Sequence, residues 1–559
     1  MLGRVSHSRP DSLAQEETLI NKRRGIAAVA TFGIASLVLA GCSASSDEGG
    51  SESTGDATAV ISTNGTEPQN PLIPTNTTEV GGGKIIDLVF AGLVSYDANG
   101  GIEMDNAESI EPNDDNTVWT VKLKDGLTFT NGDKVTADSY IKAWNYGALL
   151  SNAQSSSYFF DNIQGFSYDE DSELTGLEKT DDLTFTVSLT NAEADFPIRL
   201  GYSAYMPLPE SAYDDIDAFG ESPIGNGPYK LASEDAWSHD EGIKLVTNED
   251  YDGPRTPVNG GVDITFYTSQ DTAYSDTQSG NLDVLDQVPS STFASYEDEF
   301  GDRSVNQAAA IFQSFTIPQY LEHFGNDEEG NLRRQAISLS VDRDSIIDAI
   351  FDGTRTAAKD FTSPVIDGWS DSLEGADVLS YDPAKAKELW DKADAISEYD
   401  DTFTIAYNAD GDHEAWVTAA TNSIADSLDI TAEPQAYATF SELLDDEDND
   451  KMTGAFRSGW QADYPSMVNF LQPLYQTGAG SNYGRYSSDE FDNLLKEGGQ
   501  AASIEDATAK YEQAQEVLLK DLPVVPLWYS NVNGVWADTV SNVQYGWNSV
   551  PLYYAITKG

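Results

Sequence analysis

Apolar positions along the chain follow two periods, one typical of strands and one typical of helices. In residues 118–123 the apolar side chains of Trp119, Val121 and Leu123 occupy every second position, and residues 183–189 repeat this alternation. Side chains on a strand point alternately to opposite faces of a sheet. Both segments are therefore predicted to be half-buried strands.

Helical spacing appears between these strands and again in the second half of the chain. Thr136 is positioned to cap a helix whose Tyr140, Ile141 and Trp144 share one face. Asp382 caps another, with Pro383 in the first turn. That helix is predicted over 382–390. The other elements predicted in this half of the chain are helices over 332–339, 345–351 and 414–428, and a strand over 403–407.

Strands and helices thus alternate without a repeat of fixed period, which indicates an α/β fold. The chain has 559 residues, 39% of them hydrophobic, with 10 Trp, 27 Tyr and 22 Phe. A chain of this length is too long for one compact domain and supplies enough apolar residues for several cores. We expect two or three lobes.

The charge of the chain argues against nucleic acid as a partner. There are 94 acidic and 31 basic residues, which give a net charge of −63. Such a charge repels nucleic acid phosphates and anionic lipid headgroups. The acids are scattered along the chain, so they indicate a solvated surface and do not identify a function.

The N-terminus carries the pattern of a lipoprotein signal peptide. Lys22, Arg23 and Arg24 precede an apolar run at 25–39, which is too short to span a bilayer, and the run ends in Leu-Ala-Gly-Cys at 39–42. This ending resembles a bacterial lipobox, so we expect a signal peptide over 1–42, lipid attachment at Cys42 and a location on the extracytoplasmic face of the cell membrane. Residues 1–21 are unusually long and acidic for a signal peptide, and a downstream start is an alternative, although no second Met precedes Lys22.

The segment after Cys42 is predicted to be a flexible tether. Residues 43–58 are mostly Ser, Gly, Asp, Glu and Thr, which cannot offset their ordering entropy by burial. Cys42 is the only cysteine, so the mature chain has no disulfide and no thiolate metal site. We expect no cofactor and no metal.

Several fragments, in order, resemble the family of extracellular solute-binding proteins that includes the oligopeptide- and dipeptide-binding components of ABC importers. Together they extend over nearly the whole mature chain. The resemblance implies an α/β, periplasmic-binding-protein-like fold of class II, with two lobes around a ligand cleft and an additional domain. The fragments are FAGLV at 90–94, KDGLTF at 124–129, NGD at 131–133, TAD at 136–138, GNGPYK at 225–230, NEDY at 248–251 and RQAISLSVDR at 334–343.

The resemblance also implies discontinuous domains. Lobe I is expected to combine 59–97, 217–315 and 522–559, with 98–216 as the additional small domain and 316–521 as lobe II.

The segment 454–464, GAFRSGWQADY, is similar to the binding-cleft segment of the oligopeptide-binding members. The resemblance implies that Asp463 pairs with the free α-ammonium of a peptide, because a buried ammonium needs a charged partner. Arg457 matches a residue that meets the carboxylate of a short peptide in some relatives, a task that suits its planar fork. The remaining expected contacts are Trp460, as the wall of a side-chain pocket, the backbone of Trp460, Gln461 and Ala462, which would pair with the peptide main chain, and Tyr464.

Three further candidates come from looser similarity. They are Glu79 in a Pro- and Gly-rich loop, Tyr158 after a run of serines, and Tyr529 in the last strands. Plain packing is the alternative for all three and for Trp460, whereas Asp463 could be a surface acid and Arg457 part of a surface salt bridge.

The function expected is capture of oligopeptides outside the cell and their delivery to the permease subunits of an ABC transporter, by a monomer. One alternative keeps the fold and changes the ligand to an oligosaccharide or a metal complex, since fold alone does not fix the ligand. A second alternative, a peptide-processing enzyme, finds little support. The mature chain has three histidines and lacks HExxH, GxSxG and a Gly-rich phosphate loop.

Overall fold

The structure is a computed structural model that describes residues 55–77, 79–409, 413–438 and 440–559. The predicted signal peptide, Cys42 and residues 43–54 of the predicted tether lie outside the described residues. At the described end of that segment, the Asp56 N–H donates to the Lys558 carbonyl at 2.9 Å. No helix within the described residues is long and apolar enough to cross a membrane.

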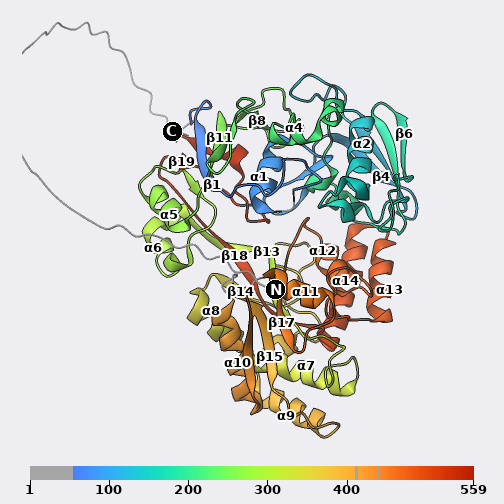
Figure 1. Ribbon diagram of the computed structural model, residues 1–559, viewed down its shortest axis with the longest axis vertical. Coiled ribbons are helices and arrows are strands. Elements are labelled where there is room, and N and C mark those ends of the chain that lie inside the picture. The colour runs from blue at the N-terminus through green and yellow to red at the C-terminus, as the bar shows by residue number, and fades with distance from the viewer. Residues whose placement is uncertain (1–54, 78, 410–412, 439) are drawn as a thin grey trace, which may run out of the picture. The chain divides into compact units, whose positions relative to one another are not determined.

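Twelve strands of the described residues form one mixed sheet, and Figure 1 shows how it extends through the molecule. Its order is β16 (Ala432–Tyr437), β15 (Phe403–Asn408), β17 (Ala455–Gln461), β13 (Ser304–Thr316), β18 (Val524–Trp536), β12 (Val284–Leu285), β1 (Val60–Gly65), β11 (Gly261–Phe266), β10 (Gly242–Thr247) and β8 (Tyr229–Leu231), with β14 (Arg355–Ala357) on β18 and β9 (Trp237–Ser238) on β10.

The two longest strands, β13 and β18, form the centre of this sheet. They pair in antiparallel fashion from Ser304↔Val535 to Thr316↔Val524, with register shifts between Ala308 and Phe312 and again after Gln313. On one side of this pair lie β12, β1, β11, β10 and β8. On the other side lie β17, β15 and β16. β13 and β18 therefore belong to both groups and connect them (Figure 1).

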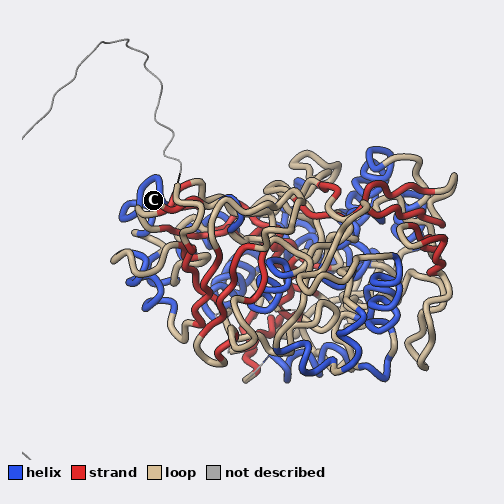
Figure 2. The backbone as a smooth tube through the Cα atoms, turned by 90° about the horizontal axis from the view of Figure 1, so that it is seen from above, coloured by secondary structure: helices blue, strands red, loops and turns tan. Residues whose placement is uncertain are grey.

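A second, four-stranded antiparallel sheet forms from the segment between β3 (Ile102–Met104) and α3 (Phe196–Arg199). Figure 2 shows its strands apart from those of the large sheet. The prediction of strands at 118–123 and 183–189 is confirmed, the second one shorter by a residue at each end. The order is β4 (Ala107–Pro112), β5 (Val118–Leu123), β7 (Thr184–Ser188) and β6 (Leu177–Asp181).

The predicted helices are present with adjusted ends. The helix at 414–428 has the predicted bounds, whereas the one predicted at 332–339 begins at Glu328, because Asp327 caps it by accepting from the Gly330 N–H at 2.9 Å. The four are α7 (Glu328–Ser340), α8 (Arg343–Phe351), α9 (Pro383–Asp394) and α10 (Glu414–Leu428). The other α-helices of the described residues are α1 (Val80–Val89), α2 (Ala137–Ala148), α4 (Ile216–Glu221), α5 (Gln270–Gln278), α6 (Tyr296–Phe300), α11 (Phe440–Asp448), α12 (Met467–Tyr475), α13 (Asp489–Gly499) and α14 (Ile504–Asp521).

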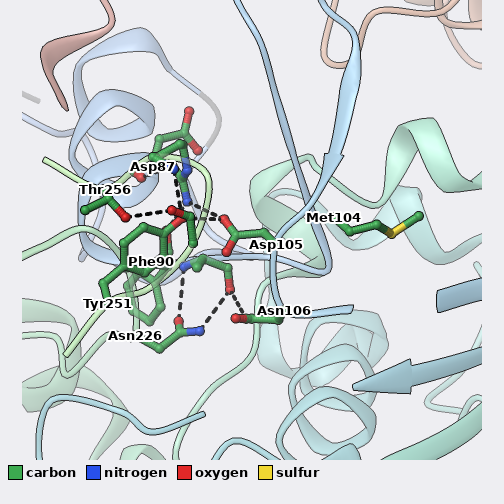
Figure 3. Close-up of polar contacts among 12 residues, drawn as sticks. Asp87, Phe90, Met104, Asp105, Asn106, Asn226, Tyr251 and Thr256 are labelled. Carbon is green, nitrogen blue, oxygen red and sulfur yellow. Dashed lines mark hydrogen bonds and ion pairs between the residues drawn. The ribbon is translucent and has the colours of Figure 1, made fainter. Parts of the chain in front are cut away.

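Three of the sequence fragments that carry the family resemblance meet in one buried network near the C-terminal end of α1 (Figure 3). The Asn226 side chain bonds both the N–H and the carbonyl of Ala91, at 3.1 Å each. The Tyr251 hydroxyl donates to Asp105 at 2.8 Å, and Arg255 lies 3.4 Å from the same carboxylate. Residues far apart in sequence thus satisfy one another's polar groups in a largely buried region.

Two glycines beside Asn226 permit this close approach. A Cβ at Gly225 would lie 1.9 Å from the Val89 carbonyl oxygen, and one at Gly227 would lie 2.6 Å from the Phe90 carbonyl oxygen. Any side chain would push α1 away from this turn. The GNG pattern is therefore a packing requirement.

The boundaries predicted for lobe I, the small domain and lobe II stay predictions. Separate buried clusters do exist within the described residues: one combines Ile61, Phe90 and Tyr229 with Ile556, and another combines Phe315, Ile337 and Trp416 with Trp528. β18 contributes Val532 to the first cluster and Trp528 to the second.

Arg343 is buried in the core and forms hydrogen bonds to three separate segments of the chain. It is 4% exposed, and it donates to the carbonyls of Pro526 and Leu379 at 2.8 Å each and of Ser338 at 3.1 Å. Burial lowers the pKa of Arg343 to about 10, so it stays charged at neutral pH. The guanidinium thus forms one junction for three backbone carbonyl groups from separate segments.

Arg343→Lys is expected to lower the free energy of unfolding by about 2 to 4 kcal/mol, because one ammonium cannot reach all three carbonyls. Urea unfolding followed by circular dichroism measures this. Arg485→Lys is the matched control, since Arg485 is 40% exposed and water can replace its bonds. Equal unfolding midpoints for the two variants would contradict the junction role.

Candidate functional site

Three cavities lie along one segment of the chain, from Arg457 to Tyr464. Cavity A, about 210 Å³, is lined by Arg457, Trp460, Phe440, Glu447 and Phe312. Cavity B, about 690 Å³, is lined by Trp460, Asp463, Tyr464, Tyr158, Asp161 and Arg199. Cavity C, about 190 Å³, is lined by Gln461, Ala462, Asp463, Glu79, Lys84 and Trp547. Trp460 belongs to A and B, and Asp463 belongs to B and C, so the three cavities adjoin along the segment.

β17, which carries this segment, is paired fully on one side only. β13 pairs with it from Phe456 to Gln461, whereas β15 pairs only with Ala455 and Phe456. Within the described residues, the other edge of 457–461 therefore has no strand partner. Such an edge can accept an extended chain as an additional strand.

The register shift in β13 positions the end of the segment. At the shift, the Ala310 carbonyl accepts from the Ala462 N–H at 2.9 Å, and the Ala310 N–H donates to the Trp547 carbonyl at 2.9 Å. Ala462 and Trp547 both line cavity C. The irregularity thus brings the chain before Asp463 and the C-terminal segment to the same cavity.

Asn469, in the first turn of α12, fixes the Asp463 side chain. Its amide donates to Asp463 Oδ2 at 3.0 Å, and its carbonyl accepts from the Asp463 N–H at 2.9 Å and from the Trp460 indole at 3.1 Å. Asp463 and Trp460 are therefore held by one residue. The carboxylate keeps capacity for further donors, because each of its oxygens can accept more than one hydrogen bond.

Burial raises the pKa of Asp463 to about 6, while the bond from Asn469 and the charge of Arg199 act in the opposite direction. No Lys, Arg or His of the described residues forms an ion pair with Asp463. Lys84, which also lines cavity C, is bound to Asp286 instead. A half-buried carboxylate without an ion-pair partner favours a ligand that brings a cation.

Asp463→Asn is expected to stabilise the ligand-free protein at pH 7.5 by about 1 to 2 kcal/mol. The folded-state pKa lies above that of the unfolded chain, so the stability cost of ionising Asp463 grows between about pH 4 and pH 6 and is constant above that range. The gain should vanish near pH 3, below both pKa values. Thermal unfolding at both pH values measures it.

Asp302→Asn is the control, since Asp302 is exposed and its loss removes the same charge. A stabilisation by Asp302→Asn at pH 7.5 that matches the one by Asp463→Asn would show that net charge, and not burial, is responsible.

Tyr464 and Tyr158 both line cavity B, in different surroundings. Tyr464 is buried, and its hydroxyl accepts from Arg199 at 3.2 Å. Tyr158 is 42% exposed and packs on Phe159, with ring centroids 4.5 Å apart. Tyr158 thus presents an open aromatic face to the cavity, whereas Tyr464 forms part of its wall.

Arg457 lies in cavity A, at the other end of the segment. Its Nε donates to Asn408 Oδ1 at 2.8 Å, and its guanidinium lies 4.4 Å from the centroid of the Phe440 ring. The contact with Phe440 places the guanidinium beside α11, whereas Asn408 holds it from the end of β15. Arg457 and Asp463 therefore place opposite charges at the two ends of one extended segment.

Glu79 lines cavity C as the cap of α1. Its Oε1 accepts from the Gly82 N–H at 3.0 Å and from the Gln69 N–H at 3.2 Å. Its Oε2 is buried and has no hydrogen-bond partner. Glu79 thus caps α1 through one oxygen, and its other oxygen is buried without a partner.

Tyr529 lies elsewhere, and we do not retain it as a ligand contact. Its side chain is fully buried and lines none of the three cavities. Its hydroxyl donates to Asp360 Oδ1 at 2.9 Å and accepts from the Trp369 indole and from two backbone N–H groups. With these partners the hydroxyl has no capacity left for a ligand.

Among the lining residues that sequence analysis did not find are Asn469, Asp161 and Glu447. Asn469 had a usable signal, because Ser466 before an apolar run marks a helix start and places Asn469 in its first turn. Asp161 and Glu447 had none, since they are acids among many and come from other elements. Within the described residues there is no group of three or more His, Cys, Asp or Glu side chains that could hold a metal ion.

A ligand-sized set of adjoining cavities, beside two strands that connect the halves of one sheet, defines a cleft-type binding protein. Residues 101–482 match the family of bacterial extracellular solute-binding proteins, family 5. The chain belongs to this family, which consists of binding proteins of ABC transport and not of enzymes, and it is an extracytoplasmic solute-binding protein.

Similar proteins differ in what they bind. The chain is 26% identical over 528 residues to the oligopeptide-binding protein OppA of Bacillus subtilis, which covers 89% of this chain and 92% of the relative. It is 25% identical over 451 residues to heme-binding protein A of Haemophilus influenzae, covering 77% and 79%. The solved structure of Haemophilus influenzae OppA in complex with the peptide RPPGFSPFR has a TM-score of 0.70 at 23% identity, covers 90% of this chain and 99% of its own, and shares the fold.

Proposed function

We propose that this protein captures short peptides with a free amino terminus and delivers them to the permease subunits of an ABC importer. The observation that carries the proposal is Asp463, a half-buried carboxylate without an ion-pair partner among the described residues, placed where two cavities meet. A peptide α-ammonium supplies the missing cation and up to three donors.

The main chain of the peptide would lie along the free edge of 457–461. Pairing there uses backbone groups only, so it gives affinity without selecting a sequence. The adjoining cavities would receive the side chains, with Trp460 as the wall between A and B. Their combined lining is mixed in polarity, which favours a range of side chains over one.

The carboxylate of the peptide would meet Arg457. Arg457 lies six positions before Asp463, which corresponds to about 20 Å of extended chain. A peptide that bridges both charges therefore has at most about six residues.

The location of the protein follows from the family, and we propose the anchor from the sequence. The family is extracytoplasmic. Lipid attachment at Cys42 would hold the mature protein at the membrane, near its permease. A tethered protein needs no oligomer to reach its importer, so we propose a monomer.

A non-peptide ligand is the second candidate, since a relative of similar identity is a heme-binding protein. The charges at the two ends of the segment favour a zwitterionic ligand over a neutral oligosaccharide, which would rely on neutral polar groups and stacked aromatic rings. Competition of haem with peptide for the purified protein would discriminate between the two.

Asp463→Asn is expected to weaken binding of a short peptide by about 2 to 5 kcal/mol, because the ammonium loses its charged partner while the shape of the site is kept. Titration calorimetry with trialanine and tetra-alanine measures this. Asp302→Asn serves as the control and should bind as the unmodified protein does. Unchanged affinity in Asp463→Asn would exclude the proposed role of Asp463.

Affinity should also fall with acidification. The ammonium binds the ionised carboxylate, and with the pKa of Asp463 near 6 in the free protein the ionised fraction drops about tenfold between pH 7 and pH 5. The dissociation constant should rise by the same factor, and binding at pH 6 should release protons, as calorimetry in buffers of different ionisation enthalpy detects. A dissociation constant that is constant from pH 7 to pH 5 would contradict this.

A further inference from the structure

Glu447 is a buried acid that the proposed function does not use. It lies on α11, is 4% exposed and lines cavity A together with Arg457. Its Oε1 is buried and has no hydrogen-bond partner. A buried polar atom without a partner is costly, so its presence beside an open cavity calls for a ligand group that satisfies it.

The surroundings of Glu447 decide which form of the acid is present. Burial raises the pKa of Glu447 to about 8, although Arg457 acts against this, and the neighbouring Asp448 raises the pKa further. At neutral pH Glu447 is therefore mostly a neutral carboxylic acid, with one O–H to donate.

We propose that Glu447 and Arg457 together form a receptor for a carboxylate in cavity A, with Glu447 donating its proton in a hydrogen bond to the ligand oxygen. The ligand carboxylate is the C-terminus of the bound peptide, and this identification rests on the proposed function. Arg457 supplies the positive charge, and Glu447 supplies a short O–H···O⁻ bond of the charge-assisted kind.

The alternatives to a carboxylate fit cavity A less well. A cationic ligand group would lie beside the Arg457 guanidinium, which repels it. An amide could accept from the two donors, but it would form weaker bonds because it carries no charge. A carboxylate accepts from both donors in charge-assisted hydrogen bonds.

Several charged or titrating groups lie near Glu447. Those that interact with it are Arg457 of β17, Asp448 of α11, Tyr437 at the end of β16, and Tyr320 and Tyr483 in loops. Burial raises the pKa of Tyr437 to about 12 and that of Tyr320 and Tyr483 above the usual range. Glu447 is therefore the group expected to ionise near pH 8, and once ionised it repels a ligand carboxylate.

The test compares peptides with and without a terminal charge. Alanine peptides of three, four and five residues and their C-terminal amides are titrated into the unmodified protein between pH 6.5 and pH 9, and the ratio of the two dissociation constants is followed for the length that binds best. Both forms carry an α-ammonium, so loss of its proton largely cancels in the ratio. The preference for the free carboxylate should decrease about tenfold from pH 7 to pH 9.

Glu447→Gln separates this receptor from a purely structural role of Glu447. Glutamine keeps a donor at every pH, so the variant should retain the preference for the carboxylate and lose its decrease above pH 7. A constant ratio in the unmodified protein, or the same decrease in Glu447→Gln, would overturn the inference even if peptides bind. A different result would be that neither the peptides nor their C-terminal amides bind the unmodified protein or Asp463→Asn. In that case the proposed function fails, and this inference fails with it.

Discussion

The antiparallel pairing of β13 with β18 connects the two sides of the large sheet and sets the position of the cavities beside it. Each strand has 13 residues, and together they belong to the strand groups on both sides of the sheet. The break in their register frees Ala310 to bond Ala462 and the backbone of Trp547. A regular ladder would use these groups itself, so the irregularity creates the position of the site.

The fold could be predicted from sequence to a large extent, because periodicity and caps act locally. The helix over 414–428 and the strand over 118–123 have the predicted bounds, and Asp382 caps α9 as expected. The fragments that carry the family resemblance proved to be junctions of buried polar groups, as at Asn226 and Arg343. They identify a fold well because few other residues satisfy such positions.

The site was predictable only where a continuous segment carries it. Arg457 and Asp463 lie on one strand and its extension, and they line adjoining cavities. Glu447 and Asp161 come from elements that only tertiary packing brings near, and nothing in an acid-rich sequence distinguishes them. The fully buried Tyr529 shows a further limit, since the position of a residue in the sequence does not tell which face of a strand its side chain occupies.

The proposed cleft holds a peptide by its two charged ends. Native mass spectrometry of residues 57–559, purified under non-denaturing conditions, tests this proposal because it gives the mass of whatever is bound. A mixture of masses that fragment as peptides of up to about six residues is the predicted result. A haem, a sugar or a metal complex in the cleft, or an empty protein that ignores a library of short peptides, would contradict it.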